Sequence, residues 1–179
     1  MMKMYISVDS DGRVNALGST PFNEESIEID VPEDHEILTN PFIFVYQDGL
    51  LIKNTEYQLE LIKKQKIKEL QNKCRETILS KFMVTINGVD YYFSNDEEAQ
   101  RNFAIAARAF DNNIITEQNW TAHDSEGNTV RITLNADTFQ TVYEAHLRHI
   151  FDNISRFRDT LFLQVKQAQS AEEVFQIVW

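Results

Sequence analysis

Four stretches of the chain alternate apolar and polar residues on both sides of a short polar turn, which is the pattern of a β-hairpin. The turns contain Asp11-Gly12, Asp48-Gly49, Asn87-Gly88 and Glu126-Gly127. Asp-Gly and Asn-Gly pairs supply the positive φ angles that tight hairpin turns require. Residues 27–31 form one more alternating strand, and all three prolines lie in the first quarter of the chain. We therefore predict a β-rich N-terminal part and two further hairpins after it.

A helix is predicted for residues 56–80, which contain no Gly or Pro and are rich in strong helix formers. The apolar stripe is narrow, and such a stripe suits a coiled-coil seam better than a globular core. Two interpretations stay open: the helix is a stalk that self-associates in a closed ring, preferably a trimer, or it packs on the hairpins of its own chain. The stripe residues that would mediate oligomerisation are Leu59, Ile62, Ile67, Leu70 and Cys74.

Later helices are marked by capping signals. Ser94 as N-cap with Glu97 three residues on predicts a capping box and a helix to about Ala109. Asn135 is expected to cap a long helix that continues to about Ala168, because its apolar residues recur at spacings of three and four.

The predicted fold class is α+β. Residues 1–54 form a small antiparallel β-rich head, and residues 55–80 form a connecting helix that is a possible coiled coil. Residues 81–179 form a C-terminal domain of two β-hairpins with helices. A second capping box at Ser170 opens a short final helix.

Composition narrows the class of protein. Of the 179 residues, 42% are apolar and 11% aromatic, which is typical of a folded globular chain. Seventeen basic residues against 28 acidic ones give a net charge of −11, so a nucleic-acid backbone would be repelled. A single cysteine, Cys74, excludes disulfide frameworks and zinc sites with several cysteines. We expect no membrane span and no signal peptide, since no apolar run approaches about 18 residues and the N-terminus turns polar at once.

The search for catalytic chemistry finds no convincing cluster. Glu144, His146 and His149 share one predicted helix, but the histidines are three residues apart with no acid between them, unlike helical metal motifs. His146 also lies on the apolar stripe, so we expect a core histidine with one bonded nitrogen. Cys74 is expected to be a small buried apolar residue. The acidic turns at residues 9–12 and 124–128 are explained by turn chemistry. We predict no catalytic residue, no cofactor and no metal ligand.

Aromatic residues on the strands could form a docking face. Most aromatic residues of strands belong to cores or to cross-strand pairs, but exposed ones are common anchors of protein interfaces. A terminal Trp is expected to contact the fold or a neighbour. The candidate docking residues are Phe42, Phe44, Tyr46, Tyr91 and Trp179.

Residues 81–179 combine an aromatic hairpin that leads into the segment 92–102, a strand pair around a polar turn, and a long helix followed by a short acidic one. The positions concerned are 92–102, Trp120, 124–127, 130–134, Phe139, His146, 168–174 and Trp179. In these features the segment resembles an uncharacterised domain family of bacteriophage tail-gene clusters, whose genes lie beside those of tail fibres or receptor-binding proteins. Residues 1–70 also look like the small β-rich heads of tail-cluster proteins, through Val31-Pro32-Glu33 and residues 46–49.

The resemblance implies a non-enzymatic protein of the tail or baseplate that connects or anchors a tail fibre or receptor-binding protein. Its partners would be other tail or baseplate proteins and further copies of itself. It would be made in the host cytoplasm and located in the virion. Members of that family have no assigned catalytic residues, so none is transferred to this chain.

Two other functions are weighed against this one. The chain could be a tail-fibre assembly chaperone that is absent from the mature virion, an idea motivated by its acidic charge. The more distant alternative is a cell-wall-degrading or metal-dependent enzyme that uses Glu144, His146 and His149.

Overall fold

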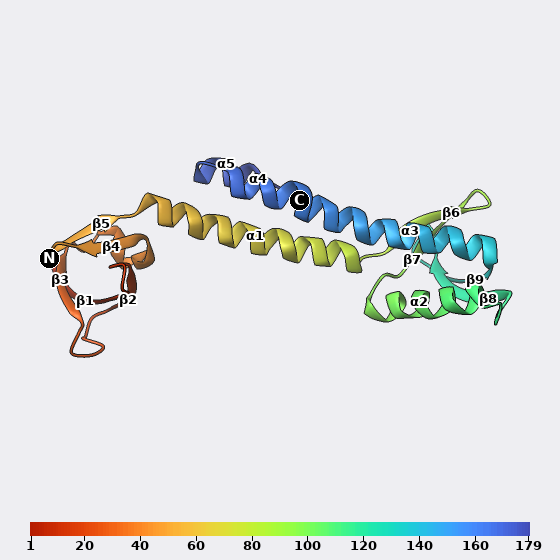
Figure 1. Ribbon diagram of the computed structural model, residues 1–179, viewed down its shortest axis with the longest axis horizontal. Helices are drawn as coiled ribbons and strands as arrows, with labels where there is room; N and C mark the ends of the chain where they lie inside the picture. The colour runs from red at the N-terminus through yellow and green to blue at the C-terminus, as the bar shows by residue number, and fades with distance from the viewer. The chain divides into compact units, whose positions relative to one another are not determined.

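All four predicted turns close antiparallel hairpins in the computed structural model, which describes residues 1–179 (Figure 1). The fold class is α+β, as the sequence predicts. The chain divides into two compact units, the first made of Met1–Gln65 with Gln169–Val174 and the second of Lys66–Ala168 with Phe175–Trp179. None of the helices combines the length and the apolar content needed to cross a lipid bilayer.

The first unit contains a three-stranded antiparallel sheet in the order β2-β1-β3 and a separate hairpin of β4 and β5. The elements are β1 (Met2–Val8), β2 (Val14–Gly18), β3 (Ile27–Val31), η1 (Glu36–Leu38), η2 (Pro41–Ile43), β4 (Phe44–Gln47) and β5 (Leu50–Lys53). Its buried core consists of Ile6, Val14, Ile29, Val31, Ile37, Ile43 and Phe44.

Gly12 holds the β1–β2 turn against β4. The carbonyl oxygen of Gly12 accepts a hydrogen bond of 2.8 Å from the amide of Tyr46. Its φ angle is +77°, and a Cβ at this position would lie 2.7 Å from the carbonyl oxygen of Tyr46. Both the conformation and the close approach therefore require glycine.

The second unit has a four-stranded antiparallel sheet in the order β6-β7-β8-β9. Its elements are β6 (Phe82–Ile86), β7 (Val89–Phe93), α2 (Glu97–Asp111), β8 (Glu117–His123), β9 (Thr129–Asn135), α3 (Ala136–Ser155), the π-helical segment η3 (Arg156–Leu161) and α4 (Phe162–Gln167). Alternate strand residues face one side, where they form a core with residues of α2 and α3. The members of this core are Phe82, Val84, Phe93, Phe103, Ala106, Ala122, Leu134, Phe139 and Val142.

Helix α1 (Thr55–Leu79) agrees with the predicted helix to within a residue and contributes to both units. Leu70 is fully buried, and the nearly buried Cys74 places its Sγ 3.5 Å from the carbonyl oxygen of Asn153 on α3. These two stripe positions are thus covered by their own chain. The element that Cys74 contacts is a helix, whereas the predicted alternative to a stalk was packing on hairpins.

The capping box predicted at Ser94 is wrong by two positions. Asp96 is the N-cap of α2, and its Oδ1 accepts the amide of Ala99 at 2.9 Å. The cap predicted at Asn135 is confirmed, and it forms a reciprocal capping box, because Asn135 and Thr138 each accept the other's backbone amide at 2.9 Å. The predicted long helix is interrupted by the π-helical turn of η3 before it continues as α4.

In both acidic turns an aspartate side chain accepts hydrogen bonds from backbone amides of the turn, as expected from the sequence. Asp9 Oδ1 accepts the amides of Asp11 and Arg13 at 2.9 Å. Asp124 Oδ1 accepts the amides of Glu126 and Asn128 at 3.0 and 2.8 Å. The hydrogen bonds from Asn128 lower the pKa of Asp124.

The short helix α5 (Ala171–Gln176) begins after Ser170, whose hydroxyl accepts the amide of Glu173 at 3.2 Å.

Candidate functional site

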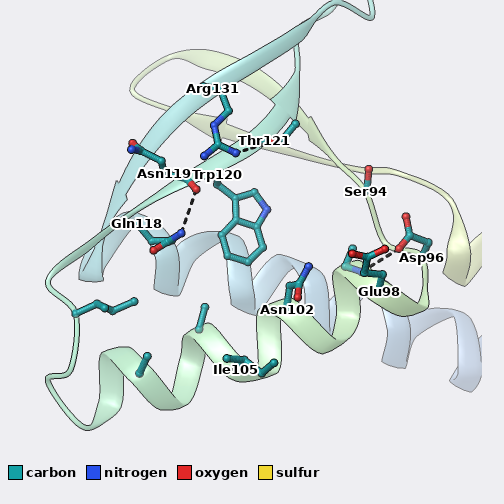
Figure 2. Close-up of a pocket in the computed structure, with 14 residues that line it drawn as sticks. Ser94, Asp96, Glu98, Asn102, Ile105, Gln118, Asn119, Trp120, Thr121 and Arg131 are labelled. Carbon is teal, nitrogen blue, oxygen red and sulfur yellow. Dashed lines mark hydrogen bonds between the residues drawn. The ribbon is translucent and has the colours of Figure 1, made fainter.

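A groove of about 530 Å³ lies between α2 and β8 in the second unit (Figure 2). It exists because β8 pairs with β7 at a single position, Tyr92 opposite His123, whereas all seven residues of β8 pair with β9. After β7 the chain leaves the sheet and enters α2. The groove is lined by Ser94, Asp96, Glu98, Ala99, Asn102, Ile105, Ala106, Ala109, Ile115, Gln118, Asn119, Trp120, Thr121 and Arg131.

Trp120 forms the aromatic wall of the groove. Its ring stacks on Phe103 of α2 with 4.6 Å between centroids and an interplanar angle of 21°, and it also meets Phe139 of α3 at 5.9 Å. Figure 2 shows the ring pointing from β8 toward α2, with Asn102 directed toward it. Two buried aromatic neighbours fix the ring, so the groove wall is rigid while part of the ring remains accessible.

The charged side chains of the groove are unevenly placed. Asp96 and Glu98 lie together at the start of α2, and both are exposed. Arg131 of β9 donates from Nη1 to the hydroxyl oxygen of Thr121 at 2.7 Å. The end of the groove near the start of α2 therefore presents two carboxylates. The single guanidinium of the groove, that of Arg131, is already hydrogen-bonded to Thr121.

The open edge of β8 also presents backbone groups. The Asp124 amide donates to the Asn128 carbonyl at 3.0 Å, so these two residues form the hydrogen-bonded pair that closes the β8–β9 hairpin. Hydrogen-bonded and non-bonded pairs alternate along an antiparallel ladder. Thr121, Asn119 and Glu117 therefore direct their backbone N–H and C=O groups away from β9. Gln118 Nε2 approaches the Asn119 carbonyl at 3.3 Å, in agreement with this direction.

His146 is a core histidine, as the sequence predicts. It is 3% exposed, and its ring stacks on Phe103 at 4.7 Å. Its Nδ1 lies 2.6 Å from Oδ1 of the fully buried Asn95, whose Nδ2 donates to the carbonyl of Ile78. Burial, and to a smaller extent the neighbouring His149, lower the pKa of His146 to about 4. The side chain is therefore neutral at pH 7.

The residues of the enzyme alternative have separate bonding partners. His149 Nε2 lies 2.9 Å from the carbonyl oxygen of Thr77 and donates to it. Glu144 is exposed and accepts a hydrogen bond of 3.0 Å from Gln140. No three His, Cys, Asp or Glu side chains lie close enough together to hold a metal ion. Burial raises the pKa of the Cys74 thiol, which agrees with its expected structural role.

The five candidate docking residues differ in accessibility. Phe42 is 47% exposed, whereas Phe44 is 4% exposed and belongs to the core of the first unit. Phe44 is therefore a core residue and has almost no surface to offer a partner. Tyr46 and Tyr91 are half-buried against their cores. Trp179 is half-buried, with the guanidinium of Arg156 4.8 Å above its ring, so it contacts its own fold.

The remaining oligomerisation candidates, Leu59, Ile62 and Ile67, are half-buried within the single chain. The sequence predicts no site at the residues of the groove. Trp120 is a feature of the family resemblance, but the residues around it give no sign of whether β8 has a neighbour along its whole length.

The family model described as "Domain of unknown function (DUF4376)" matches residues 62–178. The match begins within α1 and includes the whole four-stranded sheet and the groove. No curated protein and no solved structure matches the chain.

Proposed function

The chain belongs to the DUF4376 family. From the resemblance of residues 81–179 and from the build of the molecule, we propose that it is a non-enzymatic structural protein of a bacteriophage tail or baseplate. In this role it connects or anchors a tail fibre or receptor-binding protein through protein–protein contacts. The tail setting rests on the resemblance of residues 81–179. The connecting role rests on the structure.

The observation that carries the connecting role is the presence of two separately cored units in one chain. The first unit buries Ile6 and Ile37 completely, and the second does the same with Phe93 and Phe103. Because each unit has its own buried apolar core, each can keep its fold while a partner covers its surface. One chain can therefore hold two neighbours at once.

The chemistry of the groove also supports binding to a polypeptide. It combines an aromatic wall, an exposed Ile105 and a strand edge that pairs with β7 at one position only. Partly exposed aromatic and aliphatic side chains are the usual anchors of protein interfaces. An unpaired strand edge pairs readily with another chain.

The test is mass spectrometry of purified particles from a phage that encodes this chain. We expect the chain in a fixed ratio to the tail-fibre protein, retained after washing in high salt. A matched preparation from a phage with the gene deleted supplies the background. Its absence from intact, infectious particles would contradict a structural role.

The assembly chaperone is the second candidate, and the net charge of −11 favours it. A strongly acidic surface keeps a protein soluble and discourages non-specific association, which suits a protein that holds an insoluble client. This alternative predicts that fibre protein expressed alone is insoluble, that co-expression makes it soluble, and that finished particles lack the chain. Fibre that is soluble on its own would rule it out.

A further inference from the structure

The open edge of β8 has the geometry of a strand that lacks a neighbour. Glu117–His123 is paired with β9 along its whole length, but with β7 only at His123. The amides of Thr121 and Asn119 and the carbonyl of Thr121 point away from β9 into the space beside α2, and the Asn119 carbonyl, which points the same way, accepts Gln118 Nε2 at 3.3 Å. Along a strand, every second residue directs its backbone N–H and C=O to the same edge, at a spacing of about 6.8 Å. A neighbouring strand presents its own N–H and C=O groups at this spacing.

The groove leaves room for such a strand. The α2 side chains that face β8 are small at Ala99 and Ala106, and both line the groove. Ile105 is the large aliphatic residue of this wall, and it is 61% exposed. Trp120 forms the groove wall on the side of the core. A strand laid along β8 would place alternate side chains over the Trp120 ring and the others on the opposite side, near Thr121 and Arg131.

The charges of the groove define the occupant further. Asp96 and Glu98 stand at one end of the groove, and no basic side chain lies among the residues that line this end. A segment with lysine or arginine there gains favourable electrostatic energy, and one with acidic residues is repelled. The net charge of −11 also favours a positively charged partner.

We propose that the edge of β8 at Glu117–Thr121 binds an extended, basic segment of a partner polypeptide as an added β-strand, with its basic residue beside Asp96 and Glu98. In this mode of recognition main-chain hydrogen bonds supply affinity, and pockets for alternate side chains supply specificity. The inference rests on the proposed connecting function, since it names the kind of partner segment that the second unit holds.

The test uses the full chain and a synthetic peptide, acetyl-Lys-Thr-Val-Thr-Val-Thr-Val-Lys-amide. We expect the backbone amide resonances of Asn119 and Thr121 to shift in NMR titrations that reach about 1 mM peptide. Two isomers of the peptide, methylated on the valine nitrogens or on the threonine nitrogens, separate the two edges of the added strand. One isomer should bind like the parent peptide, and the other should bind at least about tenfold more weakly.

Variants of the protein give the matched comparison. Asn119→Pro removes an N–H that faces the groove and leaves the β9 ladder intact, a position where strands tolerate proline. It should weaken binding by about tenfold or more relative to Asn119→Ala, which removes the same side chain but keeps the N–H. A peptide with terminal Glu in place of Lys should bind more weakly than the Lys peptide.

Several outcomes would overturn the proposal. These are no shift at Asn119 and Thr121 with the Lys peptide, equal binding of the two methylated isomers, or equal binding of the Lys and Glu peptides. A change in the oligomeric mass of the protein on Asn119→Pro would instead assign the edge to a second copy of the chain. The peptide experiment uses purified protein, so its result is separate from that of the particle experiment. The peptide can fail to bind although the chain is found in particles, and it can bind although the chain is a chaperone.

Discussion

The Nδ1 atom of His146 lies 2.6 Å from the Oδ1 atom of Asn95, and the two residues are 51 positions apart in the chain. Asn95 Nδ2 donates to the carbonyl of Ile78, so its Oδ1 is left to accept, and His146 must carry its hydrogen on Nδ1. This buried polar pair joins α3 to the segment before α2 and to the end of α1. Protonation at Nε2 would keep this hydrogen bond but would place a positive charge in the buried core, and burial therefore favours the neutral form of His146.

The first prediction concerns the stability of the protein at acidic pH. The pKa of His146 is about 4 in the folded state and about 6.5 in an unfolded chain. Between these values the unfolded state binds more protons, so the free energy of unfolding should fall as the pH drops from 6.5 toward 4. The loss from this residue should reach about 3 kcal/mol. Urea unfolding at several pH values measures it.

His146→Gln is the control for the acid effect, because glutamine does not titrate and can still donate to Asn95. The difference in stability between the two proteins should shrink as the pH falls through this window. A difference that does not change with pH would show that other groups cause the acid sensitivity.

The second prediction concerns the partner of the histidine. Asn95→Leu leaves the Ile78 carbonyl and His146 Nδ1 buried without partners, and we expect a loss of about 3 kcal/mol in the free energy of unfolding. The double variant Asn95→Leu with His146→Leu should recover part of this loss, since it no longer buries the unpaired imidazole. A single variant as stable as the parent would contradict the assigned hydrogen bonds.

The third prediction concerns Gly12. Gly12→Ala forces a side chain into a left-handed conformation and against the carbonyl oxygen of Tyr46, so it should destabilise the first unit by about 2 kcal/mol or more. Gly88→Ala is the matched control. Gly88 also has a positive φ, +80°, but nothing lies within 4 Å of its added Cβ, so only the conformational cost of about 1 kcal/mol remains.

Hydrogen exchange measures both changes within their own units. The amide of buried Ile6 reports on the first unit and that of buried Val84 on the second. Equal losses for the two substitutions would mean that the contact with Tyr46 adds nothing.

The fourth prediction concerns self-association through α1. If the apolar stripe forms a stalk, light scattering should give a multiple of the chain mass of 20.9 kDa. Ile67→Asp, at a half-buried stripe position, should return the monomer, and Lys68→Asp, at the exposed neighbouring position, should not. Leu70 is unsuitable for this test because its own chain buries it completely. A monomeric parent protein would contradict the stalk.

Local sequence predicted much of the secondary structure, and particular residues show where this ends. The Asn135 cap was predictable because its partner, Thr138, is three residues away. The cap of α2 was assigned to Ser94 because Ser-x-x-Glu fits a capping box, but the helix starts at Glu97 after Asp96. Asn95, between them, is fully buried and bound to Ile78 and His146, contacts that local spacing cannot reveal.

The sequence by itself determined the hairpins, the helix over residues 56–80 and the burial of His146, because turn geometry and apolar periodicity are set by residues a few positions apart. Only the tertiary structure decided that Phe44 is a core residue, that Cys74 meets α3, and that β8 pairs with β7 at one position and leaves an open edge. These features depend on where distant segments come to lie. Their energies come from contacts that form only once the unit that contains them has folded.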